Sequence, residues 1–355
     1  WNISSSNPLI IAGPCSAESE NQVLKTAREL KSSGKVHLFR SGIWKPRTRA
    51  GQFEGKGHIA LEWLKNMREE IDLPFVIEVA NTRHVDHALN ASANALWIGA
   101  RTTVNPFYVQ EIAESLRGTD IPILIKNPIH ADLGLWLGAF ERLEKSGLHN
   151  LAAVHRGFFA SNSAPFRNDP RWEISFDFRR AAPTIPIICD PSHIAGKREL
   201  IEQITRVAMD IQMDGLMVEV HHSPKDALSD SDQQITPGKL ISLLKELDLE
   251  SKAVTPHELQ KLISDQRKIL DNLDKRIVDT LKKRMKIVDE LGHIKANNNA
   301  SVFQMERWFD LLKQRGHQAR ELGLNENFIN ELFQIIHKYS VEHQNEIYQH
   351  FRDKE

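Results

Sequence analysis

The chain lacks several features that would place it in a specialised class of protein. Only two cysteines occur among 355 residues, which excludes a disulfide framework and favours a reducing, cytoplasmic setting. No apolar run approaches the ~20 residues that span a bilayer, and no basic segment precedes the first apolar stretch, so neither a transmembrane helix nor a signal peptide is predicted. The formal net charge of −1, from 46 basic and 47 acidic residues, gives no overall attraction to nucleic acid or to a membrane.

Short apolar runs recur along the chain, and segments of helical period separate them. The predicted strands are Leu9–Ala12, Val36–Arg40, Pro74–Val79, Ala95–Gly99, Pro122–Lys126, Leu151–His155, Ile185–Cys189 and Leu216–Val220. The predicted helices between them are Glu20–Lys31, His58–Glu70, Pro106–Arg117, Leu133–Lys145 and Lys197–Met213, with a long loop expected over residues 158–183. Continuous apolar strands that alternate with helices predict parallel pairing and burial on both faces. Eight such units in about 250 residues predict an α/β fold of the (β/α)8 TIM barrel type, with a doubly wound open sheet as the alternative.

The pattern changes after Leu249. Thr255-Pro256-His257-Glu258 is typical of a capped helix start, and a helical period continues to Lys295. Two more helices are predicted, at about 302–322 and 325–352. Three helices, one of them about 40 residues long, bury little by themselves, so we expect a small all-α domain that dimerises through its long helices. The expected domains are 1–248 for the barrel, 249–256 for a linker and 257–355 for the helices.

Polar side chains follow most of the predicted strands, where a β/α barrel carries its catalytic groups. One sulfur, one nitrogen and two carboxylates come from Cys15, His193, Glu219 and Asp230. These donors suit a borderline divalent metal such as Mn²⁺, Fe²⁺, Co²⁺ or Zn²⁺. A lone buried cysteine is more often a small apolar residue. The four residues together are credible ligands for one ion.

Six cations also follow the predicted strands. They are Arg40, Lys45, Arg47, Arg101, Lys126 and Arg156. A single cation at a strand end is usually a solvated surface group. Six at one barrel mouth repel one another unless an anion neutralises them, and guanidinium groups suit phosphate and carboxylate. The spacing favours a site for a polyanionic small molecule, with a non-catalytic phosphate-binding protein as the alternative.

The motifs at the strand ends together resemble the 3-deoxy-D-arabino-heptulosonate 7-phosphate (DAHP) synthase family, in its short form without an N-terminal extension. The matching segments, in order over about residues 1–240, are Gly13-Pro14-Cys15-Ser16, Phe39-Arg40, Lys45-Pro46-Arg47-Thr48, Ile98-Gly99-Ala100-Arg101, Asp190-Pro191-Ser192-His193, Glu219-Val220-His221 and Ala227-Leu228-Ser229-Asp230. The related octulosonate phosphate synthases carry Lys-Ala-Asn-Arg in place of Lys45-Pro46-Arg47-Thr48, which favours the heptulosonate enzyme.

That resemblance implies condensation of phosphoenolpyruvate with erythrose 4-phosphate, the first step of the shikimate pathway, at a divalent metal for which Mn²⁺ is favoured. The implied metal ligands are Cys15, His193, Glu219 and Asp230, of which Cys15 and His193 are counted as catalytic together with Lys45. The residues implied to hold phosphoenolpyruvate are Arg40, Lys45, Arg101, Lys126 and Arg156. Those implied for erythrose 4-phosphate are Arg47 and Thr48, with Asp190 near its hydroxyls.

Polar residues interrupt the apolar pattern of the C-terminal helices. Arg284 and Lys295 lie within about 20° of one helix face, whereas Arg267 points about 100° away from Arg284. Ser340 and Gln344 share a face of a later helix. A solvated coiled coil would show the same periodicity. Residues 257–350 resemble the all-helical chorismate mutase family through Arg267, Leu273-Asp274, Arg284, Gly292, Lys295, Arg307, Ser340-Val341 and Gln344.

The second resemblance implies rearrangement of chorismate to prephenate. Arg284 and the partner's Arg267 would grip carboxylates, and Lys295 and Gln344 would stabilise charge on the ether oxygen. The residues implied to complete the pocket are Arg307 and Ser340.

The helical segment also departs from that family, because Gln304 and Trp308 stand where carboxylates often face the substrate hydroxyl. The alternative is a DAHP synthase whose helices only dimerise and sense a feedback ligand. Because an early and a later pathway step share one chain, inhibition of the barrel by prephenate is a further hypothesis.

Overall fold

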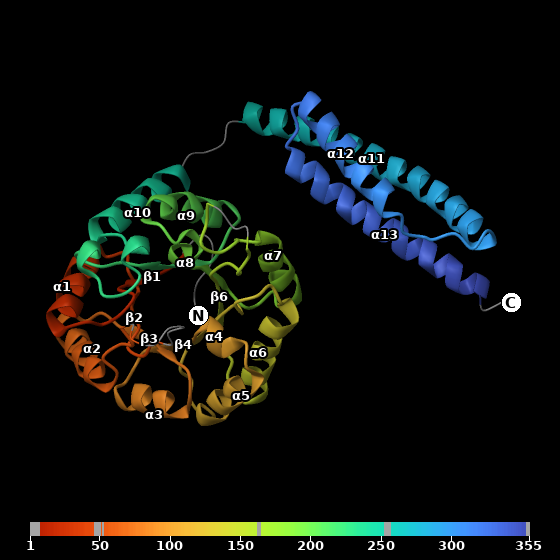
Figure 1. The fold of residues 1–355 in the computed structure, drawn as a ribbon. Coiled ribbons are helices and arrows are strands. Elements are labelled where there is room, and N and C mark those ends of the chain that lie inside the picture. The colour runs from red at the N-terminus through yellow and green to blue at the C-terminus, as the bar shows by residue number, and fades with distance from the viewer. Residues whose placement is uncertain (1–7, 46–50, 52, 162–164, 252–256, 353–355) are drawn as a thin grey trace. The chain divides into compact units, whose positions relative to one another are not determined.

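The computed structural model describes residues 8–45, 51, 53–161, 165–251 and 257–352. The chain divides into two compact units, residues 1–253 and 254–355. In the first unit, eight parallel strands pair in sequence order and close into a barrel, and Figure 1 shows the helices surrounding this ring. The predicted TIM barrel is therefore confirmed, and the open sheet is wrong.

Every predicted apolar run contains a strand, displaced by at most two residues at either end. The strands are β1 (Leu9–Gly13), β2 (Leu38–Ser41), β3 (Phe75–Val79), β4 (Ala95–Ile98), β5 (Ile123–Lys126), β6 (Leu151–His155), β7 (Ile187–Cys189) and β8 (Gly215–Glu219). The barrel closes between β1 and β8, where Leu9 lies opposite Gly215 and Gly13 opposite Glu219. This register brings the segment that follows Gly13 beside the carboxylate that ends β8.

Both faces of the barrel strands are buried. Inward-facing side chains form one apolar cluster inside the barrel, which includes Ile11, Trp97 and Met217. Outward-facing side chains form a second, larger cluster with the surrounding helices, which includes Phe39 and Ile125. Burial on both faces explains why the strands read as continuous apolar runs.

The barrel helices are α1 (Glu20–Lys31), α2 (His58–Ile71), α3 (Thr82–Asn90), α4 (Ala100–Thr103), α5 (Pro106–Ser115), α6 (Leu133–Lys145), α7 (Trp172–Ala181), α8 (Pro191–Ala195), α9 (Ile201–Asp210) and α10 (Pro237–Ser251). The predicted long loop over 158–183 is wrong for residues 172–181, which form α7. Phe178 is buried on the inner face of α7, and Arg179 and Arg180 lie in its last turn, where cations complement the helix dipole. The high polarity of the segment concealed this helix.

The second unit consists of three helices, as predicted. They are α11 (His257–Asn297), α12 (Met305–Glu321) and α13 (Glu326–Arg352). Helix α13 packs against both of the others, and Gly292 makes room for it, because a Cβ at Gly292 would lie 2.8 Å from Cδ1 of Ile347. The predicted cap residues Thr255 and Pro256 lie outside the described residues. Among the described residues, no helix combines the length and apolar character needed to cross a membrane.

Candidate functional site

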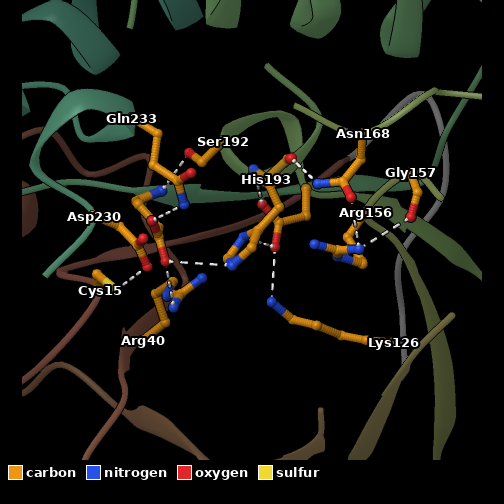
Figure 2. A network of polar contacts seen from close by, with 12 residues as sticks. Cys15, Arg40, Lys126, Arg156, Gly157, Asn168, Ser192, His193, Asp230 and Gln233 are labelled. Atoms are coloured by element: carbon orange, nitrogen blue, oxygen red, sulfur yellow. Dashed lines mark hydrogen bonds and ion pairs between the residues drawn. The ribbon is translucent and has the colours of Figure 1, made fainter. Parts of the chain in front are cut away.

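Four of the predicted strand-end residues meet at the mouth of the barrel. Cys15, Glu219 and Asp230 each offer one donor atom, and these atoms lie within 4.8 Å of one another. Sγ of Cys15 lies 3.2 Å from Oδ2 of Asp230, and Nε2 of His193 lies 3.9 Å from Oε1 of Glu219. Figure 2 shows Cys15, Asp230 and His193 approaching from different parts of the chain. The structure thus brings together the sulfur, nitrogen and two carboxylates that the sequence singled out.

The electrostatics of this cluster suit a bound cation. Burial, followed by the neighbouring Glu219 and Asp230, raises the pKa of Cys15 to about 12, although Lys45 opposes the shift. A thiolate and two carboxylates this close together are stable only with strong positive charge nearby. Nζ of Lys45 at 3.1 Å from Sγ supplies part of that charge. A divalent ion would supply the rest, so the donor set fits a metal of the borderline class.

Beside the cluster lies a cavity of about 340 Å³ with an excess of positive charge. Its charged or titratable lining residues are Lys45, Glu78, Arg101, Lys126, Arg156, Arg167, His193 and Asp230. Four of the six predicted cations are in this set. Arg47 lies outside the described residues, as does Thr48.

Arg40, the remaining predicted cation, is buried behind the metal-ligand cluster. Its Nη2 lies 3.1 Å from Oε1 of Glu219, and its guanidinium lies 5.0 Å from the centre of the Trp97 ring. Nε and Nη1 of Arg40 are buried without a hydrogen-bond partner among the described residues. Unpaired buried donors are costly, so these nitrogens are suited to an anion or to water.

Asp190 connects the cationic cavity to the imidazole of His193. Its Oδ2 lies 2.8 Å from Nζ of Lys126 and 2.9 Å from Nδ1 of His193, and its Oδ1 accepts a hydrogen bond from the His193 backbone N–H. Burial alone would raise the pKa of Asp190, but His193 and Lys126 hold it well below its usual range. Because Nδ1 faces a carboxylate, Nε2 is the nitrogen of His193 that faces the metal-ligand cluster, an arrangement common in metal sites.

The helical unit holds a second group of predicted residues. Nη1 of Arg284 lies 2.5 Å from Oγ of Ser340, and Nζ of Lys295 donates a 2.7 Å hydrogen bond to the Val302 carbonyl. Ser340 and Gln344 are buried on α13, and Gln344 packs against Gly292. Arg267 and Arg307 are exposed, and no hydrogen bond joins either to the other described residues of this group.

Comparison with known proteins accounts for both units. Residues 3–255 match the DAHP synthetase I family. The chain belongs to this family. Residues 266–345 match the family described as chorismate mutase type II.

Relatives of known identity agree with the match to the DAHP synthetase I family. The phospho-2-dehydro-3-deoxyheptonate aldolase of Thermotoga maritima is 32% identical over 244 residues, which cover 68% of this chain and 68% of that protein. A crystal structure of the DAHP synthase from the same organism gives a TM-score of 0.62 at 28% identity, over 68% of this chain and 69% of the other. The 2-dehydro-3-deoxyphosphooctonate aldolase 1 of Arabidopsis thaliana is 30% identical over 261 residues, or 67% of this chain and 86% of that protein.

Sequence reasoning missed several residues that support the site of this DAHP synthetase family member. Oδ1 of Asn168 accepts a 3.1 Å hydrogen bond from Arg156, and its Nδ2 donates one of 2.6 Å to the His193 carbonyl. Nε2 of Gln233 donates a 2.7 Å hydrogen bond to Oε2 of Glu219. Figure 2 shows Asn168 between Arg156 and His193. Asn168 lies in a loop and Gln233 at the end of a short 3-10 helix, Ser231–Gln233, and no strand end marks either position in the sequence.

Glu78 was also missed, although the sequence contains a signal for it. It is the charged residue within the otherwise apolar strand β3, Phe-Val-Ile-Glu-Val, and it lines the cationic cavity. A charge in a buried strand is costly unless the site needs it. Glu219, by contrast, was identified from its place at the end of a predicted strand.

The helical unit contains a further missed residue, His337. Its ring stacks on that of Trp308, with centroids 4.3 Å apart and an angle of 17° between the planes. Trp308 was noted only as a departure from the mutase pattern, and the structure shows that it packs against a second polar ring.

Proposed function

We propose that the chain is a bifunctional enzyme. The barrel condenses phosphoenolpyruvate with erythrose 4-phosphate to give DAHP and phosphate, and the helical unit rearranges chorismate to prephenate. The observation that carries the first activity is the cluster of Cys15, Glu219 and Asp230 beside a cationic cavity, in a chain of the DAHP synthetase I family. The match of residues 266–345 carries the second and favours a mutase over a module that only dimerises.

In the barrel, Cys15, His193, Glu219 and Asp230 would hold a divalent ion, for which Mn²⁺ is favoured and Fe²⁺, Co²⁺ and Zn²⁺ are alternatives. When bound, such an ion supplies Lewis acidity toward an aldehyde oxygen. The burial and close approach of these donors support the assignment.

The cations of the cavity have a separate task, which is to hold two anionic substrates that repel each other. Lys45, Lys126 and Arg156 are each buried or half-buried around the cavity, and Arg101 lines it from an exposed position. These four cations would bind phosphoenolpyruvate. C3 of the enol phosphate then forms a bond to the aldehyde carbon, water adds at C2, and phosphate leaves with its bridging oxygen. Arg40 would contribute its unpaired nitrogens to the anion, and Arg47 and Thr48 would hold erythrose 4-phosphate.

For Asp190 we propose a positioning role instead of contact with the sugar hydroxyls. It is fully buried. One of its oxygens lies beside Nζ of Lys126 and Nδ1 of His193, and the other accepts the hydrogen bond of the His193 backbone N–H. A carboxylate in this position fixes the orientation of the imidazole and holds a substrate-binding lysine in place. This role also explains why Asp190-Pro191-Ser192-His193 follows the buried strand β7.

We also propose that the helical unit forms a homodimer. The side chains of Leu270, Leu273, Ile277, Ile287, Leu291 and Ile294 are exposed on α11 at three- and four-residue spacing. Thr280 and Arg284 fill the two positions of this stripe between Ile277 and Ile287. Such a stripe is typical of helices that pack against another helix. The heptad spacing of the stripe favours a second copy of α11 as the helix that packs against it.

Antiparallel pairing of two α11 helices would also complete the second site. The midpoint between Arg267 and Arg284 falls between residues 275 and 276, where Leu273 and Ile277 of the apolar stripe flank it. A two-fold axis there places the partner's Arg267 opposite Arg284. Arg284, Lys295, Ser340 and Gln344 would then bind chorismate with the partner's Arg267, and Arg307 would close the pocket.

The test is one preparation of the full chain assayed for both reactions. Loss of phosphoenolpyruvate that depends on erythrose 4-phosphate, stops with a chelator and returns with Mn²⁺ is expected of the barrel. Conversion of chorismate that Arg284→Ala abolishes is expected of the helices. An active barrel in the presence of chelator would remove the metal proposal, and absence of chorismate conversion would remove the mutase.

We also propose a cellular setting for the protein and a feedback inhibitor of the barrel. The unpaired thiols of Cys15 and Cys189 support a reducing cytoplasmic setting, since a thiol that ligates a metal must escape oxidation. Inhibition of the barrel by prephenate is tested by adding prephenate to the full chain during DAHP formation, where an unchanged rate would remove the hypothesis.

A further inference from the structure

The stacked pair of Trp308 and His337 lies between two helices of the second unit. Trp308 belongs to α12 and His337 to α13, and the Phe303 ring centre is 5.8 Å from that of His337. Nε2 of His337 is buried and has no hydrogen-bond partner among the described residues. The stack therefore fixes the plane of an imidazole whose Nε2 is left unused.

The imidazole faces the same group of residues that the mutase site contains. His337 and Gln344 are seven residues apart on α13, which places them within about 20° of one face, with Ser340 between them. Burial lowers the pKa of His337, and the nearby Arg284 and Lys295 lower it further. The ring is therefore neutral near pH 7, and Nε2 can accept a hydrogen bond when Nδ1 carries the proton.

Gln344 supplies a second unused atom on this face. Its Oε1 is also buried without a partner among the described residues. One buried polar atom without a partner costs about 1–3 kcal/mol, so two of them beside two cations are suited to pairing with a polar ligand.

We propose that His337 is a specificity-determining residue of the mutase site, and that its Nε2 accepts the hydrogen bond of the substrate's ring hydroxyl. Arg284 and Lys295 offer donors only, and Gln344 is assigned to the ether oxygen, so His337 is the acceptor that this face leaves for that hydroxyl. Gln304 and Trp308 occupy the positions where carboxylates often serve in the family. Trp308 instead holds the imidazole by stacking. The inference rests on the proposed mutase activity.

The test compares two substrates and a series of variants in the full chain. The substrates are chorismate and the analogue of chorismate that lacks the ring hydroxyl. His337→Phe keeps a flat ring against Trp308 but removes the acceptor. We expect kcat/KM for chorismate to fall about tenfold, from the loss of one hydrogen bond, and kcat/KM for the analogue to stay unchanged. His337→Gln restores an acceptor and should recover part of the loss.

The control is His343→Phe on the same helix. Nε2 of His343 already has a partner, because it lies 3.2 Å from Oδ1 of Asp289, so it is not an unused acceptor like that of His337. This variant should leave both substrates unaffected. If His337→Phe disturbs folding, the ratio of kcat/KM for chorismate to kcat/KM for the analogue is measured in His337→Leu instead.

Two results would overturn the assignment. Equal losses for both substrates would show that His337 only supports packing, and no loss for either would show that it makes no contact with substrate. Failure of the mutase itself gives a different result, because the unsubstituted chain would then convert neither substrate, as expected of Arg284→Ala.

Discussion

The two units solve the problem of building a site in opposite ways. In the barrel, Asp190 and Glu219 are fully buried, and each is paired with a cation from the same chain. In the helical unit, Arg284 has its hydrogen bond to Ser340, but Arg267 and Arg307 are exposed, and α11 exposes a long apolar stripe. We therefore propose that one chain supplies the whole barrel site, whereas the helical site needs a second copy.

The difference follows from geometry. The ends of eight parallel strands converge on one mouth, so residues far apart in the chain meet there without help. Three helices have no closed edge, and each can bury only one side against the other two. We propose that the partner chain packs against the unburied side of α11.

The largest effect should separate the two units by their need for metal. A chelator should lower DAHP formation by about a thousandfold or more, because Lewis acidity contributes several kcal/mol, and Mn²⁺ should restore it. Mutase activity in the same sample should not change. Cys15→Ser should reproduce the loss. Equal sensitivity of both activities to the chelator would break the comparison.

Removal of one cation from the helical site should give the next largest effect. Arg284→Ala should lower mutase kcat/KM by about a hundredfold, because a charged donor to the substrate is lost, and should leave DAHP formation unchanged. Arg284→Lys keeps the charge but loses the guanidinium fork, and should fall between the two. Steady-state assays of both reactions decide the matter, and full mutase activity in Arg284→Ala would contradict the site.

Disruption of the proposed dimer contact along the α11 stripe should affect the helical site and leave the barrel site unchanged. Leu273→Glu places a charge in the apolar stripe of α11, so sedimentation should show monomers, and mutase activity should fall about tenfold or more. DAHP formation should persist. The matched control is Phe107→Glu on the barrel surface, where Phe107 is 79% exposed, and it should change neither activity nor mass. If Leu273→Glu remained a dimer with full mutase activity, pairing of the two chains through the α11 stripe would be excluded.

The smallest effect concerns the stability of the barrel at acid pH. Burial lowers the pKa of His155 to about 4, although the backbone of Pro170 opposes the shift. The unfolded chain therefore binds one more proton than the folded chain between pH 6.5 and 4. This group should reduce the free energy of unfolding by about 1 kcal/mol between pH 7 and pH 5.5, with no effect above pH 7.

Urea unfolding of the full chain and of His155→Phe at both pH values measures this contribution. The dependence on pH should be weaker in the variant by about that amount. Equal dependence in the two proteins would mean that His155 is not held neutral by burial.

Much of this architecture could be predicted from the sequence. Apolar runs predicted the eight strands, because strands buried on both faces are apolar throughout. Polar residues at the strand ends and in the segments that follow them gave the metal-ligand cluster. Helix α7 was not predicted from the sequence, because among its residues only Ser175 and Phe178 are buried and the apolar periodicity of the segment is weak.

The supporting residues could not be predicted in the same way. Asn168 and Gln233 act through side-chain hydrogen bonds to other segments of the chain, and no periodic pattern in the sequence predicts which segments meet there. The role of Asp190 required knowledge of which side chains its oxygens face. His337 sits in a helical segment where a polar residue can equally be a solvated one, and only the stack on Trp308 shows otherwise.

The most direct test of the difference between the two sites is complementation between inactive chains. Co-expression of Arg267→Ala with Arg284→Ala should return about a quarter of the mutase activity, since half of the dimers are mixed and each mixed dimer has one intact site. Co-expression of Cys15→Ser with Lys45→Ala should return no DAHP synthase activity. Recovery in the barrel, or no recovery in the helices, would contradict the account.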